Sequence, residues 1–297
     1  MCPLSAQEPI VTVDSLYSKA VGQMVRYKAV LPDGYSFNSD NRYNVMYLLH
    51  GHTGNYISWI SYAQLPLELA TRHNCIIVMP DGGNSWYVNW TGQTDGRPHL
   101  WEDMLAQDLV SDVDKKFRTH KDKAHRGIGG LSMGGFGALS VGLKNPEIFG
   151  FVFSSAGAIN FCKNIMAEMA GDTLDWNSPQ LWSDDTSTIP IKGFGTQQER
   201  TPKGLVFKTK ADATRYDPYT LLSKLESKRM PYIHIDCGTR DDFYGDALEF
   251  VAALATETDR FSFLVLPGEH EAPYWEQAVR HTFSIFDANL KTMKYKN

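Results

Sequence analysis

The sequence predicts an α/β protein built on a mostly parallel, doubly wound sheet. Short runs rich in valine, isoleucine, tyrosine and phenylalanine show little alternation of polar and apolar residues, which is typical of strands buried on both faces. Stretches with helical periodicity lie between these runs, so strands and helices alternate along the chain, as in α/β proteins. Glycine-rich polar segments follow several of the runs, where sheets of this kind bind ligands.

The predicted elements follow one another in a regular order. The expected strands cover residues 24–30, 44–49, 75–79, 125–130, 150–154, 231–236 and 261–266. The expected helices cover residues 101–117, 134–144, 218–228, 244–256 and 275–290. In the first helix, Leu105, Leu109, Val113 and Phe117 recur every four positions, which predicts one buried face.

Residues 158–215 interrupt this rhythm. The segment contains Trp176 and Trp182, the helix breakers Pro190 and Pro202, and a pair of glycines. The full length of 297 residues suits one domain with an insertion. We therefore expect a single domain over residues 1–297, in which the insertion follows a strand and covers the active site.

Composition and charge exclude several classes of function. The formal net charge is −5 and basic residues form no block, so nucleic acid is not an expected partner. The sequence contains no run of about 18 apolar residues, so it predicts no membrane span. The first residues show no secretory signal, so we expect a cytoplasmic protein, or a secreted one whose signal has been removed. The oligomeric state stays open.

A nucleophile is predicted at Ser132. The motif Gly-Leu-Ser-Met-Gly over residues 130–134 lies between a predicted strand and a predicted helix, which is the context of the G-x-S-x-G nucleophile elbow. Glycines are needed on both sides because side chains at 130 or 134 would collide with the neighbouring strand and helix. The alternative is a glycine-rich turn with a capping serine.

An oxyanion hole is predicted from two backbone N–H groups. One belongs to Met133, directly after the nucleophile, and the other to His52, in the loop after strand 44–49. The spacing of His50 and His52 also suits a metal, but no second cluster supplies the third ligand that a zinc site needs. The four cysteines also lack zinc-type spacing. We therefore expect no metal and no cofactor.

The base and the acid are predicted from chain order. Hydrolases with this elbow place the acid and then the base after the nucleophile. His270 follows the last predicted strand, and Asp241 follows the one before it, with Asp242 as the reserve. Asp236 falls within the strand. The histidine would accept the proton of the serine hydroxyl, and the aspartate would orient the imidazole.

Taken together, the motifs resemble the esterase D-like family of α/β-hydrolases, from about residue 25 to residue 286. The motifs that carry the resemblance are YLLHG (47–51), MPDGGNSWY (79–87), GLSMGG (130–135), CGTRD (237–241) and GEH (268–270). The family includes feruloyl and acetylxylan esterases, S-formylglutathione hydrolases, small bacterial carboxylesterases and mycolyltransferases. The resemblance implies the α/β-hydrolase fold and a serine carboxylesterase.

Two differences from the family's motifs argue against two of its activities. S-formylglutathione hydrolases typically carry a cysteine in the oxyanion loop and a histidine before the serine, whereas this chain has Leu131 there and no such cysteine. Mycolyltransferases usually lack the pair formed by Gly134 and Gly135. The expected substrates are small esters or acylated carbohydrates, including feruloyl or acetyl esters of plant polysaccharides. An acyltransferase with the same triad, an S-formylglutathione hydrolase-like thioesterase and a non-catalytic carbohydrate-binding protein remain alternatives.

Aromatic residues at Trp86, Tyr87 and Trp90 lie in a segment that follows a predicted strand. Aromatic rings can bury against a feruloyl ring or a sugar face, so we expect these three side chains to bind substrate. The alternative is that the rings only pack the loop.

Overall fold

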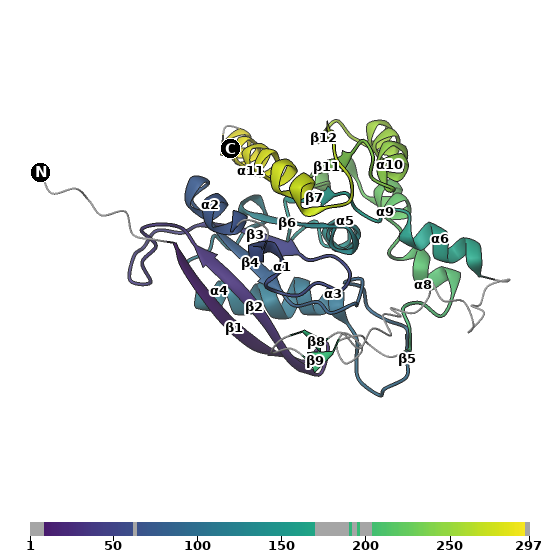
Figure 1. Ribbon diagram of the computed structural model, residues 1–297, viewed down its shortest axis with the longest axis horizontal. Coiled ribbons are helices and arrows are strands. Elements are labelled where there is room, and N and C mark those ends of the chain that lie inside the picture. The colour runs from purple at the N-terminus through teal and green to yellow at the C-terminus, as the bar shows by residue number, and fades with distance from the viewer. Residues whose placement is uncertain (1–8, 62–63, 170–189, 192–194, 197–203, 295–297) are drawn as a thin grey trace, which may run out of the picture.

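A single eight-stranded sheet forms the centre of the molecule (Figure 1). The computed structural model describes residues 9–61, 64–169, 190–191, 195–196 and 204–294. The strand order is β1-β2-β4-β3-β6-β7-β11-β12. The strands are β1 (Ile10–Ser18), β2 (Gln23–Leu31), β3 (Asn44–Leu49), β4 (Cys75–Pro80), β6 (Arg126–Leu131), β7 (Phe151–Ser155), β11 (Tyr232–Gly238) and β12 (Phe261–Leu266).

The sheet is mostly parallel, as the sequence predicts. Only β1 with β2 and β2 with β4 pair antiparallel, and every pair from β4 to β12 is parallel. The carboxyl ends of β3, β6, β7, β11 and β12 therefore meet at one edge of the sheet. Every segment that carries a predicted catalytic residue begins at that edge.

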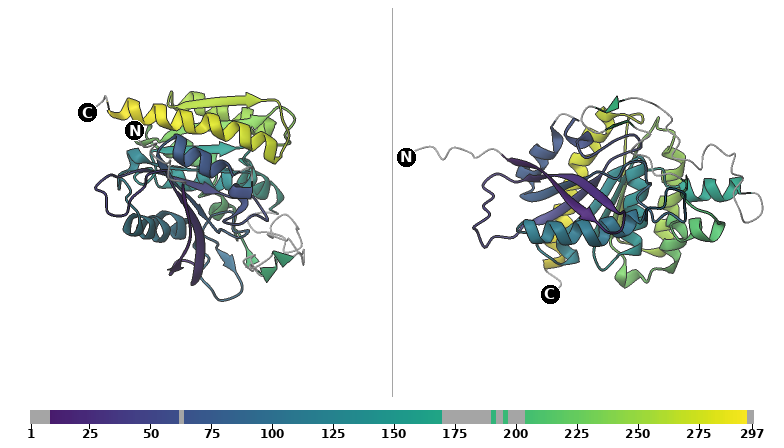
Figure 2. Two further views of the ribbon diagram at one scale, coloured as in Figure 1. Left: turned by 60° about the vertical axis from the view of Figure 1, so that its left-hand side comes forward. Right: turned by 90° about the horizontal axis from the view of Figure 1, so that it is seen from below.

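Helices cover both faces of the sheet (Figure 2). Two neighbouring residues of β7 show which helix covers which face. Phe151 packs against Phe286 of α11, with ring centroids 5.1 Å apart. Val152 faces α5, because a Cβ at Gly142 of that helix would lie 2.4 Å from it. Neighbouring residues of a strand point to opposite faces, so α5 and α11 lie on opposite faces. The main helices are α2 (Leu65–Arg72), α4 (Val110–Lys116), α5 (Met133–Lys144), α9 (Pro218–Lys224), α10 (Tyr244–Glu257) and α11 (Ala272–Lys294).

The predicted helix at 101–117 forms with a local change of winding. It consists of α3 (Trp101–Asp103), a π-helical turn (Met104–Leu109) and α4. Leu105, Leu109 and Val113 are buried, as their spacing predicts.

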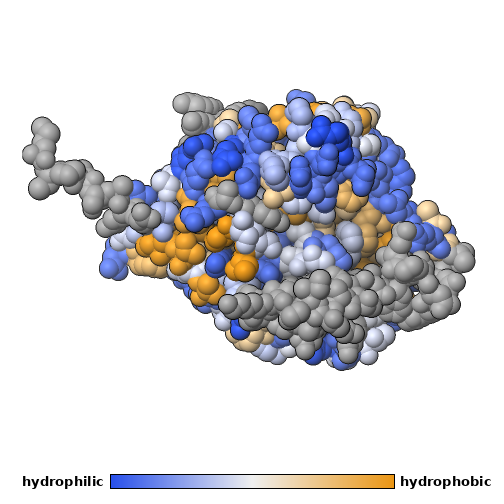
Figure 3. Space-filling model, viewed as in Figure 1, coloured by the Kyte–Doolittle hydropathy of each residue, from blue (hydrophilic) through white to orange (hydrophobic). Residues whose placement is uncertain are grey.

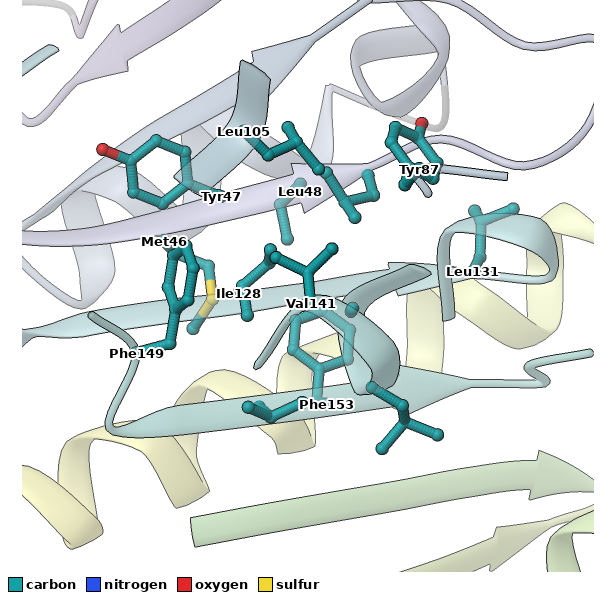
Figure 4. Close-up of a cluster of buried hydrophobic side chains, with 14 of the residues drawn as sticks. Met46, Tyr47, Leu48, Tyr87, Leu105, Ile128, Leu131, Val141, Phe149 and Phe153 are labelled. Carbon is teal, nitrogen blue, oxygen red and sulfur yellow. The ribbon is translucent and has the colours of Figure 1, made fainter. Parts of the chain in front are cut away.

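Between α5 and the middle strands, the buried core includes Leu48, Ile128, Val141 and Phe153 (Figure 4). Tyr87 also belongs to this buried cluster, although it lies in a loop. The core thus extends to the carboxyl edge of the sheet and supports the loops there.

The first two strands form a ribbon at the edge of the sheet, and hydrophobic residues gather over its beginning (Figure 3). Ile10, Val11 and Val13, at the beginning of β1, are 40%, 40% and 57% exposed. Strand β1 was not predicted, because an edge strand with mixed exposure has no clear hydrophobic period. No helix among the described residues is long and apolar enough to cross a membrane.

The predicted insertion is described in pieces. These are α6 (Phe161–Glu168), β8 (Pro190–Ile191), β9 (Gly195–Thr196), β10 (Gly204–Leu205) and α8 (Lys210–Thr214). Strand β10 pairs with β5 (Gly92–Gln93), so this part of the insertion lies against the segment that follows Trp90. Trp176, Trp182 and Pro202 lie outside the described residues.

Candidate active site

Ser132 stands on a strained turn between β6 and α5. Its φ is 54° and its ψ −122°, a conformation that costs a non-glycine residue of order 1–3 kcal/mol. A Cβ at Gly134 would lie 2.5 Å from the carbonyl oxygen of Leu49, and one at Gly130 would lie 2.6 Å from the carbonyl carbon of Gly134. The predicted collision at both glycines is therefore confirmed. Ser132 is partly exposed between buried neighbours, so the turn presents its side chain at the edge of the sheet.

His270 and Asp241 form a hydrogen-bonded pair at the same edge. Nδ1 of His270 lies 2.9 Å from Oδ2 of Asp241. Oδ1 of Asp241 accepts the N–H of Phe243 at 2.9 Å. Because the Asp241 carboxylate can only accept at this contact when ionised, Nδ1 of His270 carries the proton and Nε2 is the atom left to act as a base.

Burial distinguishes the two neighbouring aspartates. The side chain of Asp241 is fully buried, whereas that of His270 is 32% exposed. Asp242 is exposed to solvent. The His270 ring is held edge-on by Phe243 and Trp275, with centroids 5.2 Å and 5.1 Å away. Only the first aspartate is placed to orient this imidazole.

A second buried carboxyl lies behind the site, and sequence analysis assigned no role to it. Asp236 lies within β11, as predicted, and its Oδ1 accepts hydrogen bonds from the hydroxyl of Ser155 at 2.5 Å and that of Tyr274 at 3.0 Å. Burial raises the pKa of Asp236 to about 7. The carbonyl of Ser155 accepts the N–H of Ser132 at 3.1 Å. One carboxyl thus connects the nucleophile turn to the first turn of α11.

The ring of Tyr274 completes this connection. It packs so closely that a Cβ at Gly268 would lie 2.6 Å from it, and Gly268 is two residues before His270. No sequence motif marked Tyr274. The only signal was a charged residue, Asp236, inside a predicted buried strand, because a buried carboxyl must find hydrogen-bond partners.

The predicted oxyanion loop runs beside Ser132. A Cβ at Gly51 would lie 3.4 Å from Cβ of Ser132. His50 is buried; its Nδ1 lies 2.8 Å from the carbonyl of Gly51, and its Nε2 accepts the N–H of Gly82 at 2.9 Å. Nε2 of His50 thus serves as an acceptor for the backbone, and it lies 3.7 Å from Oδ1 of Asp81.

Neighbouring contacts fix the same loop. The N–H of Thr53 donates to Oδ1 of Asn84 at 2.8 Å, and the hydroxyl of Tyr87 donates to the carbonyl of His50 at 3.0 Å. The side chain of His52 is exposed, so the backbone N–H of this residue is the group predicted to serve in the oxyanion hole. Met133 is the first residue of α5, so its N–H has no acceptor within the helix.

The three aromatic residues predicted to bind substrate have different environments. Tyr87 and Trp90 are 0% and 2% exposed, and the indole N–H of Trp90 donates to the carbonyl of Ser85 at 2.8 Å. Both rings therefore pack the loop. Trp86 is partly exposed and adopts a positive φ of 58°. It stacks on Phe161 of α6 with centroids 3.5 Å apart and ring planes 8° apart.

Sequence analysis did not predict the contact that Phe161 makes with Trp86. Phe161 joins the insertion to the aromatic loop, and it also meets Phe136 of α5 at 5.1 Å. The described beginning of the insertion therefore lies against the loop that carries Trp86.

The architecture and the site define the class of the protein. The mostly parallel sheet, the serine on a strained strand-to-helix turn and the histidine after the last strand are those of an α/β-hydrolase. The sequence profile of the Esterase family matches residues 18–296. The chain belongs to this family, and it is a serine hydrolase that acts on carboxylic esters.

The names of similar proteins agree with this class. An acetyl esterase of Caldicellulosiruptor saccharolyticus is 24% identical over 91% of this chain and 95% of its own length. Esterase Rv1288 of Mycobacterium tuberculosis is 28% identical over 86% of this chain, which spans 53% of that protein. An endo-1,4-beta-xylanase/feruloyl esterase of Xylanibacter ruminicola is 31% identical over 46% of this chain and 20% of its own length.

Solved structures show the same fold. An S-formylglutathione hydrolase from Staphylococcus aureus superposes with a TM-score of 0.70 and 23% identity, covering 95% of this chain and all of the other. A ferulic acid esterase from Anaeromyces mucronatus gives 0.61 and 17% identity, with 97% and 93% covered. The predicted α/β-hydrolase fold is confirmed.

Proposed function

We propose that the protein hydrolyses carboxylic esters through an acyl-enzyme on Ser132, with His270 as the base and Asp241 as its orienting acid. The observation that carries the proposal is the 2.9 Å hydrogen bond between Nδ1 of His270 and the buried carboxylate of Asp241. It leaves Nε2 of His270 as the proton acceptor, at the sheet edge where Ser132 also lies.

The reaction follows from these roles. Nε2 of His270 accepts the hydroxyl proton of Ser132 as Oγ attacks the ester carbonyl, and the N–H groups of Met133 and His52 stabilise the oxyanion. His270 then gives the proton to the departing alkoxide, which leaves an acyl group on Ser132. Water, activated by the same histidine, releases the acid and restores the serine.

We further propose that the substrate is an acylated carbohydrate carrying acetyl or feruloyl groups. The relatives named as acetyl esterase and xylanase/feruloyl esterase support this class. Trp86 supports it as well, because a partly exposed indole can bury against an aromatic acyl group or a sugar face.

A substrate panel tests the proposal. Wild-type protein and Ser132→Ala would be assayed with p-nitrophenyl esters of increasing acyl length, methyl ferulate and acetylated xylan. Turnover by the mutant should fall by on the order of a millionfold, and mass spectrometry of the wild type should detect an acyl adduct on Ser132. Retention of more than about a hundredth of the activity by pure, folded mutant protein would remove Ser132 from this role.

The same assay separates hydrolysis from transfer. Free acid should appear in plain buffer at the rate at which the alcohol leaves. If the acid appears only when a sugar acceptor is added, the protein is an acyltransferase. Cleavage of S-formylglutathione in preference to every oxygen ester would favour the thioesterase alternative.

A further inference from the structure

We propose that His120, Asp122 and His125 form a binding site for a divalent transition-metal ion, with Zn²⁺ as the ion of reference. One ligand atom from each of the three residues lies within 4.8 Å of the other two. Two imidazoles and a carboxylate are a donor set that suits zinc, nickel and copper. The only histidine spacing in the sequence that was taken to suit a metal is that of His50 and His52.

The turn that carries the three residues is held at both ends. Thr119 and Arg126 flank it; both are buried, and each bonds to one oxygen of Asp114, at 2.6 Å and 2.8 Å. The N–H of His120 donates to the carbonyl of Tyr43 at 3.0 Å. The backbone is therefore fixed by contacts other than those of the ligands, and a metal ion would meet a site that is largely formed.

Within the turn, the side chains already converge. The His120 and His125 rings stack with centroids 4.2 Å apart and planes 24° apart. Nδ1 of His125 lies 2.7 Å from Oδ1 of Asp122. Two ligands of one zinc ion, each about 2.0–2.1 Å from it, stand roughly 3.0–3.5 Å apart, so small side-chain rotations suffice.

Charge favours a cation at these atoms. The carboxylate of Asp122 supplies a negative charge, and its ligand atom lies within 4.8 Å of the ligand atoms of both histidines. Lys123 opposes a cation, but its ammonium lies 3.6 Å from the carboxylate of Glu147.

Metal binding at this site exchanges a proton for a metal ion. The proton shared by Nδ1 of His125 and Oδ1 of Asp122 must leave when both atoms become ligands, and any proton on the ligating nitrogen of His120 must leave too.

The site is remote from the chemistry. Strand β6 begins at Arg126 and its last residue precedes Ser132, and six strand residues span about 20 Å. A metal here would stabilise the turn before the strand that carries the nucleophile, and it would take no part in ester cleavage. The inference is therefore independent of the proposed function.

Titration calorimetry and thermal melting with zinc, nickel and magnesium chloride test the site. Wild-type protein should bind one zinc ion and one nickel ion per chain at pH 7.5. About 100 μM zinc should raise the melting temperature by about 2 °C or more. Magnesium should have no effect, because it prefers oxygen ligands.

Variants assign the binding to these residues. The double variant His120→Ala/His125→Ala should lose the zinc stoichiometry and the thermal shift, and Asp122→Asn should weaken binding by about tenfold or more. His281→Ala removes an exposed histidine outside the cluster and should bind zinc as the wild type does. Equal zinc binding by the double variant and the wild type, or no zinc binding by the wild type, would overturn the proposal.

Discussion

At the scale of single residues, the choice between two neighbouring aspartates is decided by where each side chain lies. Asp241 is buried and hydrogen-bonded to His270, whereas Asp242 is exposed. Asp241→Asn should keep the geometry but favour the wrong tautomer of His270, with a loss of about ten-thousandfold in turnover. Asp242→Asn should cost little, because an exposed charge is screened by solvent.

Turnover of both purified aspartate variants near neutral pH, with folding verified by circular dichroism, measures the difference. A severe loss in Asp242→Asn alone would transfer the acid role to that residue. Little loss in either variant would place the acid on another strand.

The buried carboxyl of Asp236 should make stability depend on pH. Its pKa in the folded protein is about 7, because it is buried, against about 3.9 in an unfolded chain. A raised folded pKa means that the group favours folding fully only below about pH 4, and that this advantage is lost as the pH rises through 7. Asp236→Asn removes the buried charge and retains an oxygen that can accept from Ser155 and Tyr274.

Asp236→Asn should therefore gain stability relative to the wild type as the pH rises from 4 to 7. The gain should level off above pH 7, at no more than about 4 kcal/mol. Urea unfolding at pH 5 and pH 8.5 measures it, with Asp242→Asn as an exposed control. Equal differences at the two pH values would show that Asp236 does not titrate in this range.

At the scale of elements, the nucleophile turn depends on the close approach of α5 to β3. Gly134→Ala places a methyl group 2.5 Å from the carbonyl oxygen of Leu49, so the turn and the oxyanion loop must separate. We expect turnover to fall by about tenfold or more, because small displacements of catalytic groups are costly. The free energy of unfolding should fall by about 1–3 kcal/mol.

Gly245→Ala is the matched control for this prediction. Gly245 lies in α10, and a Cβ there meets nothing within 4 Å. The same substitution should be neutral or stabilising by up to about 1 kcal/mol, with unchanged turnover. Equal turnover and equal free energies of unfolding in the two glycine variants would show that the close contact at Gly134 affects neither activity nor stability.

The insertion should influence substrate choice through α6. Phe161 stacks on Trp86, and Phe161→Leu removes the ring while keeping an apolar side chain. We expect KM for methyl ferulate to change about threefold or more, with p-nitrophenyl acetate cleaved nearly as before, because one aromatic contact contributes about 0.5–1.5 kcal/mol. An unchanged ratio of kcat/KM for the two substrates would show that α6 does not influence substrate choice.

At the scale of the whole molecule, the two proposed sites lie at opposite ends of β6. Ser132, His270 and Asp241 follow the carboxyl ends of β6, β12 and β11, whereas the cluster proposed to bind a metal lies before β6. A serine mechanism needs no metal. Protein treated with a chelator and desalted should therefore retain its full esterase activity. Complete loss of activity that added zinc restores would contradict the serine mechanism proposed here.

Much of the fold could be predicted because periodicity and burial leave local traces in the sequence. The apolar runs of β3 and β12 and the helical period of α5 and α10 fall within one or two residues of their expected limits. Strand β1 and the short helices α2 and α6 were missed. Each is short or partly exposed, so its hydrophobic pattern is too weak to separate from that of a loop.

The sequence by itself determined the elbow at Ser132, the order of the catalytic candidates and the α/β class, because these depend on glycines, strand ends and periods that lie close together in the chain. Only the tertiary structure decided that Asp241 rather than Asp242 meets His270, that Tyr87 and Trp90 are buried while Trp86 stays partly exposed, and that Asp236 joins Ser155 to Tyr274. Those outcomes depend on contacts between segments far apart in the chain. Burial, which the sequence does not specify residue by residue, sets the environment of each group.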